Sequence, residues 1–188
     1  VAAGRRLGDG RGRNGRRRGV GMSGTMRGAV IGLGMMGRHH ARLLQTHPGL
    51  GFAGAVDPAG DRHGAVSDRS LLHPSIAALL DSDARPDFAV VSVPTDEHLT
   101  AARELVAAGV HVLVEKPLAG TVADGEELIA AVEGAGVRGA VGHVERFNPA
   151  LLELRRRLQD GQLGEIFLIA TERLGPFPDR IRDVGVVK

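Results

Sequence analysis

Three glycines at a fixed spacing are the first residues in this chain that point to a particular chemistry. Gly32, Gly34 and Gly37 form the pattern G-x-G-x-x-G between an apolar run that predicts a buried strand and a run that predicts a helix. In this context the first glycine permits a tight turn, the second lets the backbone approach a pyrophosphate, and the third lets helix and strand pack closely. The helix start offers N–H groups and partial positive charge to phosphates. We predict a dinucleotide site; the alternative is an ordinary glycine turn in a chain with 28 glycines.

An acidic residue at the end of the second predicted strand supports the same site. Asp57 ends the run 51–57 and lies 20 positions after Gly37, the spacing expected for a carboxylate that accepts a hydrogen bond from the ribose 2′-OH. A carboxylate there repels a 2′-phosphate, so NAD is favoured over NADP, although the nearby Arg62 weakens this preference. The alternative is a turn residue, because Asp57 precedes Pro58.

The lysine content of the chain draws attention to one residue. Among 24 basic residues only Lys116 and the terminal Lys188 are lysines, and Lys116 follows the apolar strand predicted at 110–114. Unlike arginine, lysine loses its proton readily when desolvated, and Pro117 restricts the backbone directly after it. We predict that Lys116 donates to a substrate hydroxyl or acts as an acid or base. The alternative is a solvated ammonium at a strand end.

Strands and helices are predicted to alternate and so to bring these residues together. The expected strands are 28–32, 51–57, 87–93, 110–114 and 139–142, and the expected helices are 35–46, 75–81, 96–108 and 121–134. Thr95 is a candidate cap for the third of these helices, Gly109 its end, and Thr121 with Asp124 the start of the fourth. This alternation predicts an α/β fold with a Rossmann-type, doubly wound parallel sheet. Ligands of such sheets bind at the carboxyl ends of the strands.

Charge and composition separate a tail from the body of the chain. Residues 1–21 hold seven arginines and one acidic residue, and removing them leaves 17 basic and 21 acidic residues, so the high pI belongs to the tail. We expect this Gly/Arg-rich tail to be disordered and the translated product to begin at Met22 or Met26. A nucleic-acid-binding arm is possible on charge alone, but we expect no nucleic-acid partner. The chain has no cysteine and no apolar run long enough for a membrane span, and we expect a cytoplasmic protein.

The segment Val114–Leu118, taken with the glycine pattern and the stretch from Val93 to His98, resembles the Gfo/Idh/MocA oxidoreductases, which are nicotinamide-dependent sugar and polyol dehydrogenases and related reductases. Residues 142–149, and residues 175–178 before 183–187, are similar to the branch that acts on UDP-N-acetyl-hexosamines, the UDP-N-acetylglucosamine 3-dehydrogenase branch. The resemblance extends from about Arg27 to the end of the chain.

The resemblance implies roles for particular side chains. Lys116 would be the catalytic residue, binding the reacting sugar hydroxyl and assisting proton transfer, and Arg146 and Asn148 would face the substrate. The residues implied to bind the cofactor are Gly32, Gly34, Met35, Met36, Gly37, Asp57, Pro94, Thr95, His98, Glu115 and Lys116. Ordinary alternatives stay open: Thr95 as a helix cap, His98 as a helix residue, Arg146 as a surface ion-pair partner. Arg173 and Arg180 remain undecided, His39 and His40 are expected to pack or face solvent, and no metal site is expected.

The expected domains are a tail at 1–26, an NAD-binding Rossmann domain at 27–145, and only the start of an α+β second domain at 146–188. That start comprises a helix at 149–160 and a strand at 165–173. Family members continue further, with an Asp and a His that assist the lysine and a sheet that forms a homo-oligomer, so we expect a fragment or a truncated product. Three hypotheses follow: an oxidoreductase of a sugar or sugar nucleotide, a catalytically incomplete NAD-binding domain, or an S-adenosylmethionine-dependent methyltransferase.

Overall fold

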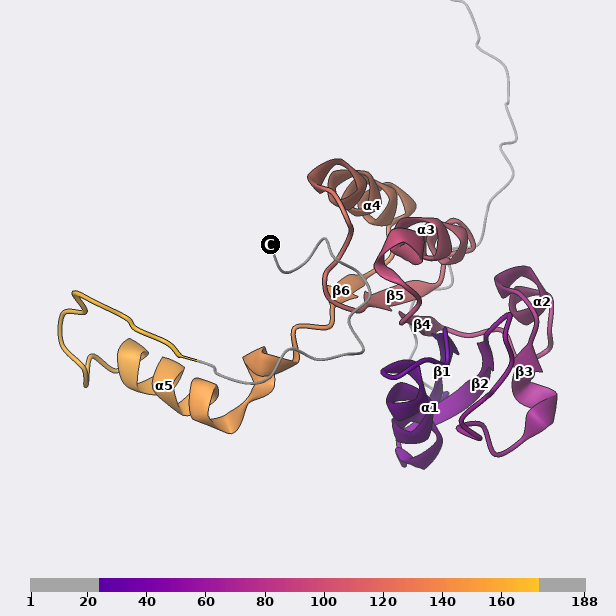
Figure 1. Ribbon diagram of the computed structural model, residues 1–188, viewed down its shortest axis with the longest axis horizontal. Coiled ribbons are helices and arrows are strands. Elements are labelled where there is room, and N and C mark those ends of the chain that lie inside the picture. Colours follow the sequence, from indigo (N-terminus) through magenta and orange to yellow (C-terminus); the bar gives the residue numbers. More distant parts are fainter. Residues whose placement is uncertain (1–23, 173–188) are drawn as a thin grey trace, which may run out of the picture.

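A six-stranded parallel sheet forms the centre of the computed structural model, which describes residues 24–172 (Figure 1). The strand order is β3-β2-β1-β4-β5-β6, and every pairing is parallel. The strands are β1 (Met26–Ile31), β2 (Leu50–Val56), β3 (Leu72–His73), β4 (Phe88–Val91), β5 (His111–Val114) and β6 (Gly139–Val141). This order, in which the chain moves outward from β1 in both directions, is that of a dinucleotide-binding Rossmann fold. The predicted fold class is confirmed.

The helices connect these strands where the sequence predicts them. They are α1 (Gly37–Thr46), α2 (Ile76–Leu80), α3 (His98–Ala107), α4 (Val122–Ala135) and α5 (Pro149–Gln159), with short 3-10 turns η1 (Arg69–Leu71), η2 (Thr95–Glu97) and η3 (Val144–Phe147). Predicted and observed ends agree within about two residues for the strands and helices of the sheet domain. The two-residue strand β3 was not predicted.

Alternating side chains of the strands build a separate core on each face of the sheet. In β1, Ile31 packs into the cluster that includes Leu79, Leu105 and Leu128 from α2, α3 and α4. Val30 points the other way, into the cluster that contains Leu44 of α1. Burying an aliphatic side chain of this size stabilises the fold by about 1.5–3 kcal/mol. Helices therefore cover both faces of the sheet, and the carboxyl ends of the strands lie at an edge that the helices leave uncovered.

Local capping confirms one predicted helix start and corrects another. At α4 the Thr121 side chain accepts from the N–H of Asp124 at 3.1 Å, and Gly136 ends the helix in the left-handed conformation. Thr95 is the first residue of η2 and makes no cap bond, so its predicted capping role is wrong. The preceding residue, Pro94, takes the N-cap position of η2, and α3 itself begins four residues after Pro94, at His98.

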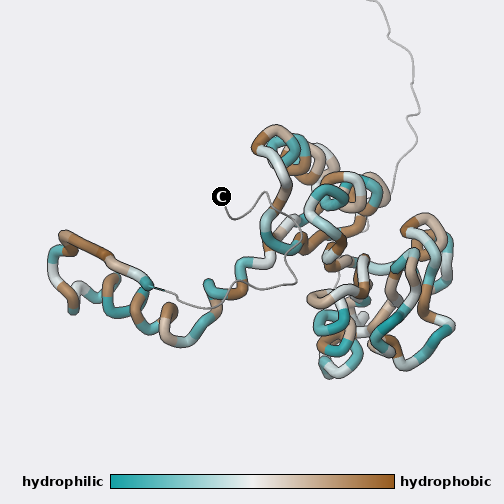
Figure 2. The backbone as a smooth tube through the Cα atoms, viewed as in Figure 1, coloured by the Kyte–Doolittle hydropathy of each residue, from teal (hydrophilic) through white to brown (hydrophobic). Residues whose placement is uncertain are grey.

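The chain beyond β6 leaves the sheet. After η3 it forms α5, which lies away from the α/β body (Figure 1) and contains no buried residue. A run of hydrophobic residues follows α5 (Figure 2), with Phe167 86% exposed. The predicted strand at 165–173 is wrong over residues 165–172, because these residues pair with no other strand. The tail predicted to be disordered at 1–21, the candidate start Met22, the segments at 175–178 and 183–187, and Arg173 and Arg180 all lie outside the described residues.

No helix within residues 24–172 is both long enough and apolar enough to cross a membrane. The predicted boundary between the two domains, at residues 145 and 146, falls inside η3, between the last strand of the sheet and α5. The described structure therefore consists of a six-stranded sheet with its helices, followed by η3, the projecting helix α5 and the residues up to 172.

Candidate functional site

The predicted dinucleotide residues follow β1 and its neighbour β4 at the carboxyl edge of the sheet. From β1 the chain passes to α1 on one face, whereas from β4 it passes to α3 on the other. The connections therefore change from one face of the sheet to the other between these two neighbouring strands. Ligands of open α/β sheets bind at such a switch point.

Contacts within the protein explain why two of the three positions in the loop are glycines. Gly32 has φ +88°, and an added Cβ would lie 2.9 Å from the backbone of Ser92 and Val93. At Gly37 a Cβ would lie 1.8 Å from the carbonyl oxygen of Gly32. An added Cβ at Gly34 would meet no described atom within 4 Å, and its φ is not positive. The protein itself gives no reason for a glycine at position 34, whereas a phosphate lying against the backbone would.

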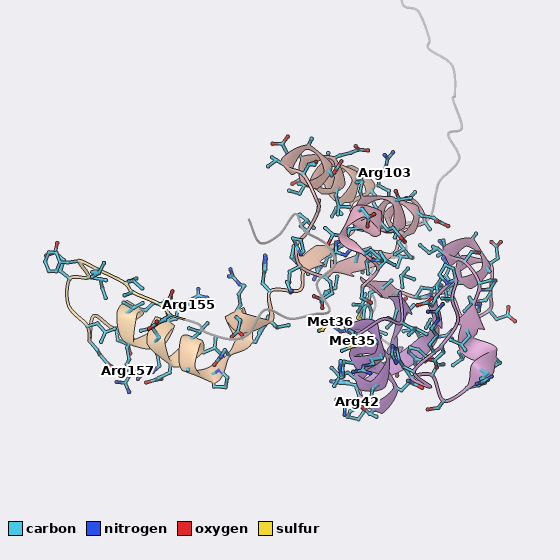
Figure 3. All side chains as sticks on the ribbon, viewed as in Figure 1. Met35, Met36, Arg42, Arg103, Arg155 and Arg157 are labelled. Carbon is cyan, nitrogen blue, oxygen red and sulfur yellow. The ribbon has the colours of Figure 1, made fainter. Side chains whose placement is uncertain are left out.

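The start of α1 leaves its positive end available. Its N-cap residue is Met36, which makes no side-chain cap bond, and the first turn contains no acidic residue. Met35 and Met36 lie together at this end of the helix and are 47% and 41% exposed (Figure 3). The N–H groups of Arg38 and His39 bond to the carbonyl oxygens of Gly34 and Met36, so it is the partial positive charge of this helix start that suits a pyrophosphate.

Asp57 joins the glycine loop to the turn after β2. Its Oδ2 accepts from the N–H of Leu33 at 2.8 Å, and its Oδ1 accepts from the N–H of Ala59 at 2.8 Å. The residue is partly exposed. An ionised carboxylate has about four acceptor positions, so it has capacity for a ribose hydroxyl as well. The turn role and the predicted ribose role are therefore compatible.

The segment after β5 places Lys116 at the same edge. Lys116 is exposed, and its amine makes no hydrogen bond or ion pair within the described residues. The Lys116–Pro117 peptide bond is cis. Glu115, its neighbour in sequence, is only 5% exposed. The segment therefore combines an exposed amine with a buried carboxylate on adjacent residues.

His98 holds the segment that follows Lys116. The ring is 1% exposed; Nδ1 lies 3.0 Å from the carbonyl oxygen of Pro117, and Nε2 lies 3.0 Å from that of Val93. Either tautomer therefore donates to a backbone carbonyl. Thr95 is partly exposed and makes no side-chain hydrogen bond within the described chain, which leaves its hydroxyl free for a ligand. Pro94, beside it, is exposed.

The two predicted substrate residues lie on η3 and at the start of α5. Arg146 is exposed in η3. Asn148 caps α5, because its Oδ1 accepts from the N–H of Ala150 at 3.0 Å while its Nδ2 donates to Glu145. The structure does not bring these side chains into contact with Lys116. Their substrate role remains a prediction.

Sequence reasoning missed two site residues. The Ser92 hydroxyl lies 2.9 Å from the carbonyl oxygen of Gly32, to which it donates. His40, expected to pack or face solvent, instead pairs with Glu115 across a gap of 75 positions. The spacing of these residues in the sequence predicts neither contact. No group of three or more histidine, aspartate or glutamate side chains within residues 24–172 could hold a metal ion.

Comparison with known proteins agrees with this geometry. Residues 26–143 match the Gfo/Idh/MocA family model, described as an oxidoreductase family with an NAD-binding Rossmann fold. The chain is 34% identical over 164 residues to UDP-N-acetylglucosamine 3-dehydrogenase from Acidithiobacillus ferrooxidans, covering 86% of this chain and 50% of that protein. It is also 34% identical over 173 residues to inositol 2-dehydrogenase 2 from Saccharopolyspora erythraea, covering 87% and 50%.

Solved structures of related proteins share the fold. The Acidithiobacillus ferrooxidans enzyme matches with a TM-score of 0.61 at 33% identity, covering 70% of this chain and 42% of that one. The WlbA dehydrogenase from Bordetella pertussis, in complex with NADH and UDP-GlcNAcA, matches with a TM-score of 0.68 at 26% identity, covering 76% and 42%. The chain spans about half the length of the curated relatives it matches. This chain therefore belongs to the Gfo/Idh/MocA oxidoreductase family, and residues 26–143 are its NAD-binding Rossmann fold.

Proposed function

We propose that this chain forms the cofactor-binding part of a dehydrogenase that transfers hydride between NAD and a hydroxyl or ketone of a sugar. The observation that carries the proposal is that one sheet edge holds both the glycine loop at Gly32–Gly37 and the amine of Lys116, which has no partner among residues 24–172. A site that only bound a dinucleotide would need the loop but not an amine beside it.

Three features of the described chain suit NAD. The open space over Gly34 admits a pyrophosphate, and the uncapped start of α1 stabilises its charge. Asp57 retains acceptor capacity for a ribose hydroxyl, and its negative charge disfavours a 2′-phosphate, which makes NADP the less favoured cofactor. The hydroxyl of Thr95 and the surface of Pro94 supply further contacts at the neighbouring strand. When bound, NAD supplies the hydride acceptor.

Lys116 supplies the proton chemistry in this proposal. Oxidation of a secondary alcohol removes a hydride from carbon and a proton from oxygen, leaving a ketone. The Lys116 amine binds the hydroxyl oxygen and takes part in moving that proton; in the reverse direction it donates to the forming hydroxyl. Its exposure and lack of an ion-pair partner within residues 24–172 leave it free for this contact.

A sugar nucleotide is the substrate class that we propose first, with Arg146 and Asn148 as its contacts. The support is the similarity to a UDP-N-acetylglucosamine 3-dehydrogenase and to a dehydrogenase in complex with UDP-GlcNAcA. The similarity to an inositol 2-dehydrogenase makes a free polyol the competing substrate. A homo-oligomer remains a prediction from the family resemblance, and a cytoplasmic location remains a prediction from the sequence.

Because the chain spans about half the length of these relatives, binding and turnover require separate experiments. NADH binding to the 188-residue chain is measured by calorimetry, against NADPH and S-adenosylmethionine. NAD reduction is then followed with UDP-N-acetylglucosamine and with myo-inositol, using Lys116→Met as the inactive control. Turnover that Lys116→Met abolishes supports the dehydrogenase. Binding without turnover supports the incomplete binding domain, and absence of NADH binding overturns the proposal.

A further inference from the structure

A hydrogen-bonded pair with little solvent exposure joins the helix of the glycine loop to the residue before Lys116. His40 Nε2 lies 2.7 Å from Glu115 Oε1, and the two side chains are 18% and 7% exposed. A carboxylate oxygen accepts, so Nε2 carries the hydrogen and donates whether the ring is neutral or charged. His40 belongs to the first turn of α1, three residues after Gly37, and Glu115 directly follows β5. The pair therefore connects the phosphate-binding part of the predicted site to its catalytic part.

The other oxygen of the same carboxylate reaches the lysine. Glu115 Oε2 accepts from the backbone N–H of Lys116 at 3.2 Å. Gly142 packs against a third side of the Glu115 carboxylate, because a Cβ added at Gly142 would lie 3.0 Å from Oε2. The Glu115 backbone N–H is itself bound to the carbonyl of Val91 at 2.9 Å. The carboxylate is thus fixed between a histidine, the Lys116 peptide and a glycine, with 5% of the residue exposed.

We propose that His40 is a positioning residue for Lys116 and acts through Glu115. The Glu115 carboxylate orients the Lys116 peptide only while its other oxygen is held, and the His40 ring holds it. The proposal builds on the function proposed for Lys116. It changes the role of Glu115: its carboxylate is directed at His40 and the Lys116 peptide instead of at the cofactor ribose that the family resemblance implies.

The two lysines of the chain allow a direct test that needs neither cofactor nor substrate. A protein labelled with [¹⁵N]lysine gives two backbone amide signals, from Lys116 and Lys188. In His40→Ala we expect the Lys116 amide proton to move upfield, because its hydrogen bond to the carboxylate weakens, while the Lys188 signal stays. In His40→Gln a side-chain N–H again reaches the carboxylate, so we expect the wild-type position to be largely restored. His39→Ala, which changes the exposed neighbouring histidine, is the matched control and should move neither signal.

NADH affinity provides the second measurement. Coupling through a shared contact typically changes affinity by about two- to thirtyfold, so we expect His40→Ala to weaken NADH binding within this range and His39→Ala to leave it unchanged. An unmoved Lys116 amide in a folded His40→Ala protein overturns the proposal, as does a His40→Gln protein that behaves like the alanine variant. If the wild-type chain does not bind NADH, the proposed function is overturned, whereas the amide measurement still tests the contact between His40, Glu115 and Lys116.

Gly142→Ala keeps the proposal testable if His40→Ala fails to fold. Its added methyl group would lie 3.0 Å from Oε2 and 3.2 Å from Oε1 of Glu115, so it displaces the carboxylate while the His40 side chain itself is unchanged. We expect the His40 ring signals and the Lys116 amide signal to move together in this variant. Movement of the Lys116 signal with unchanged His40 ring signals would show that the two are not coupled, which overturns the proposal.

Discussion

Gly34 allows cofactor binding to be separated from folding by a single methyl group. Because a Cβ at this position meets no described atom within 4 Å and φ is not positive, Gly34→Ala places no strain on the protein. We expect the free energy of unfolding to stay within about 0.5 kcal/mol of wild type, or to rise by about 0.4–1 kcal/mol through the loss of unfolded-state entropy. Thermal and urea unfolding measure this change.

The same methyl group occupies the space where we place the pyrophosphate. If it costs one hydrogen bond to a charged oxygen, the loss is about 1.5–3 kcal/mol. Since about 1.4 kcal/mol corresponds to a factor of ten, NADH should bind about 10- to 150-fold more weakly in calorimetry. Gly134→Ala is the matched control: its Cβ also meets nothing, but it lies near the end of α4, and we expect unchanged affinity.

Gly37→Ala completes the comparison from the other side. Its Cβ would lie 1.8 Å from the carbonyl oxygen of Gly32, so α1 must move away from the loop and stability must fall. A folded Gly34→Ala protein that binds NADH within twofold of wild type would refute the placement of the phosphates over this loop. A Gly34→Ala protein that unfolds would refute the claim that no protein contact requires this glycine.

Three further substitutions test other parts of the same region. Asp57→Asn removes the charge that opposes a 2′-phosphate and one backbone acceptor, so calorimetry should show a lower preference for NADH over NADPH, and urea unfolding a loss of about 1 kcal/mol. His98→Leu leaves one backbone carbonyl group, that of Pro117 or Val93, without its donor and should lower the free energy of unfolding by about 1–3 kcal/mol; an unchanged value would show that the ring only fills space. Burial raises the pKa of Asp61, but hydrogen bonds from backbone N–H groups, including those of Ala65 and Val66, together lower it by more, so the pKa is lower than its ordinary value. The stabilisation by the ionised Asp61 is therefore complete above the ordinary aspartate pKa and is lost as pH falls through the lower folded-state pKa. In urea unfolding, the free energy of unfolding of Asp61→Asn should thus fall less steeply with decreasing pH than that of the wild type. Parallel pH dependences for the two proteins would contradict this assignment.

The fold was predictable where a short pattern decides the local structure. Thr121 and Asp124 begin α4 and Gly109 follows α3 as expected, because capping and left-handed glycines depend on neighbouring residues. Strand β3 was missed because Leu72 and His73 are too few for a periodic pattern. Residues 165–172 have a strand-like composition, but a strand also needs a hydrogen-bonded partner, which residue type does not report.

The arrangement of the candidate site was likewise predictable only where its residues lie close together in the sequence. The glycine pattern and Asp57 were predicted to lie together because the βα unit that positions them is continuous in sequence. The hydrogen bond from the Leu33 N–H to Asp57 agrees with that placement, and their cofactor roles remain predictions. The pair of His40 and Glu115 was not found, because its residues lie 75 positions apart and meet only when β5 and α1 reach one sheet edge. Predicting that contact requires coordinates.

The two carboxylates at this edge show why position alone does not assign a role. Asp57 and Glu115 both follow parallel strands, β2 and β5, and both were predicted to bind the cofactor. Asp57 is partly exposed and held by two backbone N–H groups, so its unused acceptor positions can still receive a ribose hydroxyl. Glu115 is 5% exposed and enclosed by His40, Gly142 and the Lys116 peptide. A carboxylate in the first setting can bind a ligand directly, whereas one in the second acts on its neighbours, and here the neighbour is the lysine.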